Sequence, residues 1–149
     1  MKTKVNEIKI SYQATMGFFE SDAIGSSRHA ANFLYENWDR DTISIYETFK
    51  VLLLNNSNLV NATFTVSRGG MTGTLVDMRI LFAVVLKSLS VGIILAHNHP
   101  SGTLKPSTED QRITDKIKNA GKFFDIKLLD HLILVPNGNY FSFADEGLL

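Results

Sequence analysis

The sequence contains no cysteine, and this absence excludes several kinds of site at once. Disulfide frameworks, thiolate zinc sites and cysteine nucleophiles cannot form, and the composition fits a reducing compartment without proving one. Any metal ligands in this chain must therefore be histidine, aspartate or glutamate side chains.

A net charge is also absent, because 15 basic residues balance 15 acidic ones. Such a chain has no overall field that would attract phosphate backbones or anionic lipids, so nonspecific nucleic-acid binding is not expected. The longest apolar runs, 80–86 and 91–96, are too short to cross a bilayer, and residues 1–13 lack the apolar core of a signal peptide. We therefore expect a cytoplasmic protein without membrane contact.

Linker-like segments, repeats and low-complexity stretches are missing too, and all three prolines lie in the last third of the chain. With 149 residues, 44% of them hydrophobic, the chain is typical of one soluble domain. A chain of this length buries roughly two thirds of its unfolded surface without a structural metal, so a bound metal is free to be catalytic. We expect residues 1–40 to form a strand and helix extension packed on the same domain as residues 41–149.

Local patterns predict an α/β fold with a mixed β-sheet flanked by helices. At the N-terminus, Val5, Ile8 and Ile10 suggest an edge strand, and Ser21-Asp22 is a candidate cap for a helix that runs to about Trp38. The remaining predictions are a hairpin of strands 49–54 and 59–67, a helix over 78–89, a buried strand over 91–97, a helix that begins at 107–110 and extends to Phe124, and a second hairpin of strands 126–135 and 140–143.

Two histidines lie at the carboxyl end of the predicted buried strand. His97 and His99 are two residues apart, so both side chains point to one face and can reach one ion at roughly 2.0–2.1 Å, whereas Asn98 faces the other way. Asp110 follows in the first turn of the next helix, after a Pro/Gly loop that can fold this turn back over the strand end. Open α/β sheets commonly place their sites in such a crevice.

Two imidazoles and a carboxylate leave the fourth position of a tetrahedral zinc ion free for water, which is typical of catalytic zinc. The ion and a dry site lower the pKa of that water to about 7 in favourable cases, so it becomes a hydroxide nucleophile at neutral pH. We predict one Zn²⁺ per chain on His97, His99 and Asp110. The same residues also fit roles without a metal: a hydrogen-bonded pair of core histidines, and an aspartate that only favours the helix dipole.

A hydrolase of this kind also needs a carboxylate that moves a proton from the water to the leaving amine. Glu47 is the candidate, because it stands just before the strand that begins at Phe49. Composition alone does not single it out over Glu36 or Asp41, and a glutamate next to a strand is usually solvated.

The residues His97-Asn98-His99-Pro100-Ser101-Gly102, then Pro106-Ser107 and Asp110, resemble the His-x-His-x7-Ser-x2-Asp motif of the JAMM/MPN metalloproteases. More narrowly, the His-Asn-His-Pro-Ser-Gly form, together with Asp130-His131 and Phe141-Ser142-Phe143-Ala144, resembles the RadC group. The resemblance covers roughly residues 47–149 and implies a JAB/MPN fold of cytidine-deaminase-like architecture. Full-length RadC proteins usually carry a helix-hairpin-helix region ahead of this domain, and we expect none in this chain.

The resemblance also implies roles for particular residues. His97, His99 and Asp110 would bind zinc, Glu47 would handle the proton, and Ser107 would hydrogen-bond the tetrahedral oxyanion. The implied function is a zinc-dependent metallopeptidase or isopeptidase that acts on a protein or peptide substrate. The alternative is a catalytically silent binding module or adaptor associated with DNA repair or mobile elements, with nucleic acid as a partner by family association only.

Two further residues have alternative roles between which the sequence does not decide. Ser107 also fits a helix cap, which stabilises a helix by about 1 kcal/mol, and both roles can hold together. His131 fits either a partner that orients a metal ligand or one half of a buried structural pair with Asp130. The oligomeric state and the identity of the substrate do not follow from the sequence.

Overall fold

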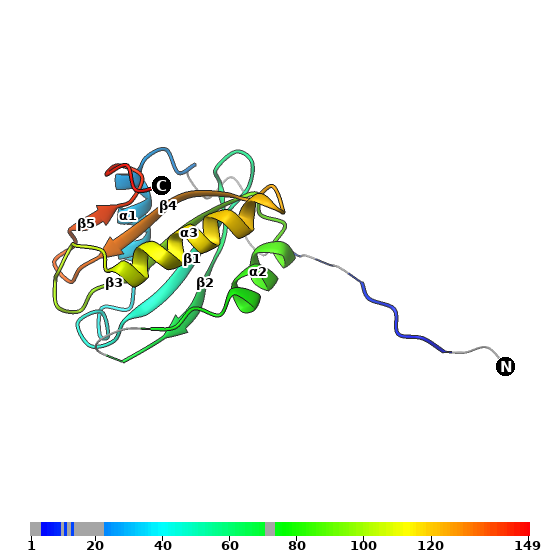
Figure 1. The fold of residues 1–149 in the computed structure, drawn as a ribbon, viewed down its shortest axis with the longest axis horizontal. Coiled ribbons are helices and arrows are strands. Elements are labelled where there is room, and N and C mark those ends of the chain that lie inside the picture. Colours follow the sequence, from blue (N-terminus) through cyan, green and yellow to red (C-terminus); the bar gives the residue numbers. More distant parts are fainter. Residues whose placement is uncertain (1–3, 10, 12, 14–22, 71–73) are drawn as a thin grey trace.

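The computed structural model describes residues 4–9, 11, 13, 23–70 and 74–149. Its centre is a five-stranded sheet in the order β2-β1-β3-β4-β5. The strands are β1 (Thr48–Leu54), β2 (Val60–Arg68), β3 (Gly92–Asn98), β4 (Lys127–Leu134) and β5 (Tyr140–Ser142). β3 and β4 are parallel and the other neighbours are antiparallel, so the predicted mixed sheet is confirmed (Figure 1).

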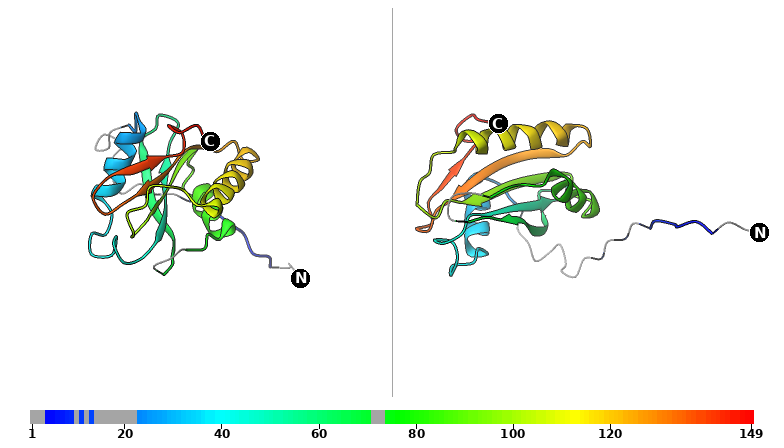
Figure 2. Two further views of the ribbon diagram at one scale, coloured as in Figure 1. Left: turned by 60° about the vertical axis from the view of Figure 1, so that its left-hand side comes forward. Right: turned by 60° about the horizontal axis from the view of Figure 1, so that its bottom comes forward.

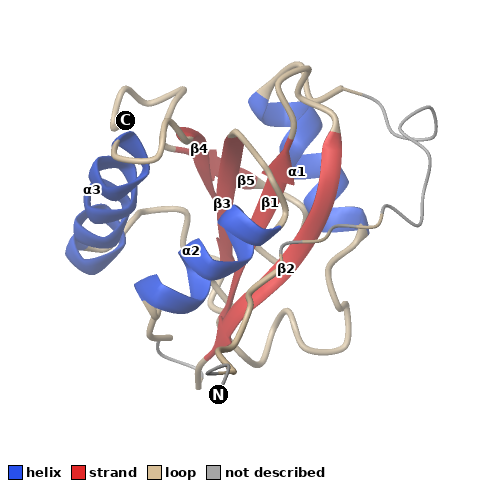
Figure 3. Ribbon diagram, turned by 90° about the vertical axis from the view of Figure 1, so that its right-hand side faces the viewer, coloured by secondary structure: helices blue, strands red, loops and turns tan. Residues whose placement is uncertain are grey.

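Helices cover both faces of the sheet. α1 (Ser27–Glu36) lies on one face, and α2 (Met78–Lys87) and α3 (Thr108–Lys122) lie on the other (Figures 2 and 3). The alternation of side chains along each strand produces two apolar cores. Leu52 and Ile94 pack in the core under α1, whereas Val51 and Leu95 pack in the core under α2 and α3. The protein is therefore a single three-layer α/β domain.

β3 is buried along its whole length because it lies between β1 and β4 and is covered on both faces. This burial explains its nearly continuous apolar sequence. The hairpin of β1 and β2, the helix α2 and the strand β3 each agree with the sequence prediction to within one or two residues. α2 ends two residues earlier than expected, and Leu89 beyond it has a positive φ of 57° that no helix continues through.

The predicted N-terminal strand was wrong where the structure describes it, whereas the predicted helix is present as α1 and ends at Glu36. Val5 and Ile8 lie outside any strand and are 82% and 91% exposed, because no sheet edge lies beside them to bury their side chains, whereas Ile10 is outside the described residues (Figure 1). The proposed cap Ser21-Asp22 is also outside the described residues. α1 begins at Ser27 because the side chain of Ser26 accepts a hydrogen bond from the His29 N–H.

The C-terminal elements are slightly shorter than predicted. α3 ends at Lys122, so Phe124 is not part of the helix and is 50% exposed, although its ring packs against Phe82 of α2. β5 ends at Ser142, one residue before the expected end. The short β5 pairs only with residues 132–134 of β4, which leaves the first half of β4 as an open edge of the sheet.

Candidate metal centre

His97, the first of the two histidines, lies at the carboxyl end of strand β3. His97 is 1% exposed, and its ring stacks on Phe49 of the neighbouring strand β1. His99 lies just beyond β3, where its N–H donates to the Leu134 carbonyl and continues the ladder with β4. The two Nε2 atoms face each other at 2.9 Å. The structure thus brings together the two histidines that strand periodicity placed on one face.

The loop after His99 turns the chain back toward the same point. Gly102 adopts a φ of 86°, a conformation that favours glycine, and its N–H donates to the His99 carbonyl. Nδ1 of His99 lies 2.6 Å from the Thr103 carbonyl oxygen. A carbonyl only accepts, so Nδ1 carries the proton, and in the neutral ring Nε2 is left with a free lone pair.

Asp110 approaches both histidines from the first turn of α3. Its Oδ1 lies 3.3 Å from His97 Nε2, and its Oδ2 lies 3.5 Å from His99 Nε2. Burial acts to raise the pKa of Asp110, but the polar contacts with His97 and His99 outweigh it and hold this pKa well below its usual range. Burial acts to lower the pKa of His99, and the Asp110 contact reverses that effect. An Asp110 carboxylate that stays ionised beside two imidazoles contributes negative charge to the cluster, which suits a cation.

Glu47 completes the cluster from the other side of the cleft. One oxygen of its carboxylate and one atom each from His97, His99 and Asp110 all lie within 4.8 Å of one another. Burial raises the pKa of Glu47, and the two histidines partly offset this rise. The alternatives Glu36 and Asp41 are exposed at the end of α1 and in the following turn, and neither belongs to the cluster.

Asn98 holds the segment that carries Glu47, a role that the sequence did not predict. Its side chain points away from the histidines, as expected, and is fully buried. The Nδ2 group donates to the carbonyls of Ile43 and Tyr46 at 2.8 and 2.7 Å, and Oδ1 accepts from the Thr48 N–H at 2.8 Å. The backbone is therefore fixed on both sides of Glu47. A fully polar side chain on a buried strand was the available signal for this role.

Ser107 lies at the rim of the same cleft. Its Oγ accepts from the Asp110 N–H at 3.0 Å, and its own N–H donates to Asp110 Oδ2 at 2.8 Å, which is a reciprocal capping box. The capping role is thus present in the structure, and it also fixes the Asp110 carboxylate. The contact uses a lone pair of Oγ, so the O–H remains a donor for the cleft.

A buried chain of hydrogen bonds runs behind the cluster. The Thr114 hydroxyl donates to the Asp110 carbonyl at 2.5 Å, so its oxygen accepts from His131 Nδ1 at 2.6 Å. His131 Nε2 must then accept from His97 Nδ1, which lies 2.8 Å away. The chain leaves His97 Nε2 without a proton and with its lone pair directed at the cluster. Burial holds the pKa of His131 well below its usual range, so its ring is neutral.

Asp130 does not form the side-chain pair with His131 that the sequence allowed. Oδ1 accepts from the backbone N–H groups of His131 and Ala144, and Oδ2 accepts from the Ser142 hydroxyl at 2.6 Å. Asp130 therefore ties the end of β5 to β4, while the ring of His131 contacts His97. Of the two roles for His131, the structure shows the contact with the candidate ligand.

Three of the four donors, Glu47, His99 and Asp110, line a cleft of about 870 Å³, and the buried His97 lies directly behind them. The lining of the cleft also includes Ser107, Arg68 at the end of β2, and Thr74 from the segment after it. Two imidazole lone pairs and two carboxylates that converge in this way repel one another unless a cation lies among them. The donor set fits zinc, which binds imidazole nitrogen and carboxylate oxygen in a tetrahedral arrangement.

Comparison with known proteins agrees with this geometry. The family model for the RadC-like JAB domain matches residues 24–148. The chain belongs to the RadC family. This JAB domain starts within the segment 1–40, so the match includes α1 as well as the sheet.

The curated relatives of this JAB domain are named as UPF0758 proteins, a name that states no activity. One from Flavobacterium johnsoniae is 52% identical over 103 residues, which is 69% of this chain and 44% of the relative. One from Porphyromonas gingivalis is 46% identical over the same length, which is 45% of that relative. One from Clostridium acetobutylicum is 39% identical over 131 residues, 88% of this chain and 56% of the relative. The chain thus spans about half the length of the curated relatives that it matches.

Among the described residues, no helix is both long and apolar enough to cross a lipid bilayer.

Proposed function

We propose that this protein is a zinc-dependent hydrolase that cleaves a peptide or isopeptide bond in a protein or peptide substrate. The observation that supports it is the convergence of Glu47, His97, His99 and Asp110 in one cluster, three members of which line an open cleft. The histidines and Asp110 are the proposed ligands, and zinc held by them would supply a Lewis acid that polarises a carbonyl group and lowers the pKa of water.

Glu47 is the proposed proton carrier. It comes from the segment before β1, the strand that pairs with β3 and places Phe49 beside His97. Its half-buried carboxylate faces the cleft, so it can take a proton from the attacking water and deliver it to the leaving amine nitrogen. Asn98 holds the backbone on both sides of it, which keeps the carboxylate in place during both transfers.

Ser107 is the proposed donor to the substrate oxygen. Negative charge develops on the carbonyl oxygen when water attacks, and a preorganised O–H group at the cleft stabilises that charge. The capping box fixes the serine relative to Asp110, so its hydroxyl needs no rearrangement when the substrate binds. Capping and catalysis are compatible here because they use different parts of the same hydroxyl group.

Metal analysis of protein purified without a histidine tag tests the zinc site. We expect about one zinc per chain in the wild-type protein, as in other catalytic zinc sites. His97→Ala and Asp110→Asn should each remove it, and the exposed Glu36→Gln is the matched control that should leave it bound. A wild-type protein that binds no zinc would contradict the enzyme proposal and favour the binding module.

A substrate-profiling digest of a proteome-derived peptide library tests the reaction. The wild-type protein should produce new termini or release new amines, whereas Glu47→Gln should retain zinc and lose turnover by a factor of roughly 10² or more. A Glu47→Gln variant with full activity would remove this residue from the mechanism. Loss of zinc from that variant would instead assign Glu47 to the metal as a fourth ligand.

A further inference from the structure

The outer edge of β4 is only partly covered. β5 pairs with residues 132–134, and the Phe143 N–H donates to the His131 carbonyl just before them. At the start of β4, the Lys127 N–H donates to the Val91 carbonyl oxygen, so this N–H points toward β3. The ladder between β3 and β4 shifts register after the pair of Ile93 and Leu128, but backbone groups alternate up to that point, so the N–H and C=O of Leu128 point to the open edge. Free peptide groups at a sheet edge are a template for another strand.

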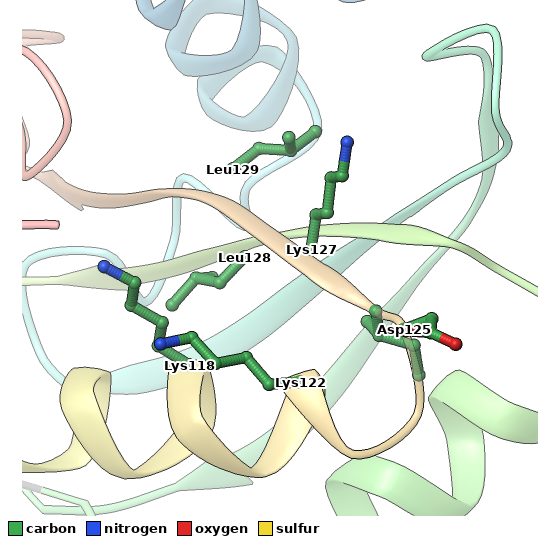
Figure 4. Close-up of a pocket in the computed structure, with 7 residues that line it drawn as sticks. Lys118, Lys122, Asp125, Lys127, Leu128 and Leu129 are labelled. Carbon is green, nitrogen blue, oxygen red and sulfur yellow. The ribbon is translucent and has the colours of Figure 1, made fainter.

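A hollow of about 460 Å³ lies along this edge, between α3 and β4. Leu128 and Leu129 contribute apolar surface to its lining, and three lysines surround it: Lys118, Lys122 and Lys127. Lys118 and Lys122 extend from α3 on the side of the strand that carries Leu128, whereas Lys127 extends to the other side with Leu129 (Figure 4). We call this hollow the β4 groove.

The lysines give the β4 groove a positive charge within a chain whose net charge is zero. None of the ion pairs among the described residues involves Lys118, Lys122 or Lys127. One carboxylate, that of Asp125, is among the described residues that line the groove. The three ammonium groups favour an acidic ligand, and the apolar side chains favour one that is partly apolar. The free backbone edge favours a ligand in an extended conformation.

We propose that the β4 groove binds an extended acidic peptide segment of a partner protein, which adds a strand beside Leu128. A second copy of this chain is a poorer occupant, because edge-to-edge pairing would bring the lysines of both copies together. Single-stranded nucleic acid is also poorer, because none of the described residues that line the groove has an aromatic ring on which a base can stack.

The β4 groove is separate from the candidate metal centre. His97 pairs with Ile133, whereas Leu128 pairs with Ile93, at the opposite end of β3. At about 3.3 Å per residue, the four steps from Ile93 to His97 separate the two sites by roughly 13 Å along the strand. The proposal therefore goes beyond the proposed hydrolase, and binding at the groove requires no metal.

Binding of a fluorescein-labelled peptide of alternating glutamate and valine tests the proposal by fluorescence anisotropy at low salt. The double variant Lys118→Glu/Lys122→Glu should weaken binding at least about tenfold, and the exposed Lys87→Glu/Lys116→Glu pair is the control of equal charge change. N-methylation of alternate peptide groups on the pairing edge should weaken binding to a similar extent, because it removes the donors that face Leu128. His97→Ala should bind the peptide as tightly as wild type.

Amide NMR on the same mixture locates the site, and the expected result is a shift of the Leu128 amide signal. The proposal is overturned if the peptide does not bind, if the control pair weakens binding as much as the groove pair, or if N-methylation has no effect. Stronger binding of oligothymidylate would assign the surface to nucleic acid. A concentration-dependent dimer that protects the Leu128 amide from exchange would assign the edge to a second copy.

Discussion

At the scale of single residues, His131 has the clearest predicted effect outside the four donors. It connects His97 Nδ1 to Thr114 and sets the proton on the side of His97 that faces away from the cluster. The variant His131→Phe keeps a ring of similar size stacked on Phe143, but it leaves the His97 N–H without an acceptor. Loss of such a partner typically weakens metal binding 10–100-fold, so we expect a zinc Kd higher by about that factor.

A competition titration with a zinc chelator measures this effect. Thr114→Val is the graded control, because it removes only the far end of the chain and should weaken zinc binding less than His131→Phe does. Circular dichroism at the same temperature verifies that both variants are folded. An unchanged zinc Kd in a folded His131→Phe protein would show that His131 only fills space.

The sequence predicted the convergence of His97, His99 and Asp110 because each of these residues is placed by a pattern among its near neighbours in the chain. The period of a strand places the histidines on one face, and the helix cap places the aspartate in a first turn. The roles of Asn98 and His131 depend instead on how β3 pairs with β1 and β4. Those pairings join residues about 35 to 50 positions apart in the chain, and no local period encodes them.

At the scale of secondary-structure elements, Ser107 allows capping and catalysis to be separated. Ser107→Ala removes the cap of α3 and should lower the free energy of unfolding by about 1 kcal/mol, whereas Ser107→Asn supplies another good cap and should preserve it. If the hydroxyl also stabilises charge on the substrate, turnover falls in both variants. Denaturant unfolding measures the capping effect in both variants, and turnover measures the catalytic effect. Full activity of Ser107→Asn would show that the serine acts only as a cap.

Asp130 gives a pH dependence to the junction between β4 and β5. Burial raises its pKa, although Ser142 and two backbone N–H groups partly offset the rise. The folded protein therefore holds this proton more tightly than the unfolded chain, whose aspartates titrate near 3.9. The stabilisation is fully present below that pH and is lost as the pH rises through the folded pKa.

The variant Asp130→Asn removes this titration while it keeps an acceptor for both backbone N–H groups. We expect the stability of Asp130→Asn relative to wild type to increase as the pH rises from about 4 towards 7. Urea unfolding of both proteins at several pH values measures the difference. A stability difference that is constant over this range, or one that decreases, would contradict the assigned direction of the shift.

The elements that were predicted well have strong local signals, and the errors occur where the outcome depends on tertiary contacts. Asp77, Ser107 and the turn at 55–58 mark boundaries by their own hydrogen bonds. Val5 and Ile8 have the alternation of a strand, but a strand needs a neighbour, and no described strand lies beside them. The open half of β4 was unpredictable for the same reason, because it follows from the short length of β5.

At the scale of the whole molecule, the donors come from two parts of the chain that the sheet already holds together. Glu47 precedes β1, and the other three donors follow along β3 and α3. The antiparallel pairing of β1 with β3 reaches Phe49 and His97, so the sheet itself brings the two parts to one end. The apolar cores on both faces of the sheet contain none of the four donors.

The protein should therefore remain folded when zinc is removed, unlike a zinc finger, and zinc should add stability to an already folded domain. At a free zinc concentration 100 times the Kd, the free energy of unfolding should rise by about 2.7 kcal/mol. For a chain of this size each kcal/mol raises the Tm by roughly 2–4 °C, so we expect an increase of roughly 5–11 °C. Differential scanning calorimetry of chelator-treated protein with and without zinc measures it.

Asp110→Asn is the control for this prediction, because it keeps the capping geometry of α3 and removes a proposed ligand, and its Tm should not respond to zinc. Ions that bind elsewhere on the surface would raise the Tm of both proteins equally. A wild-type chain that unfolds on chelation would mean that the metal carries part of the folding free energy, as in structural zinc sites. That result would contradict the assignment of an open, catalytic position, because structural zinc is held by a closed set of four protein ligands.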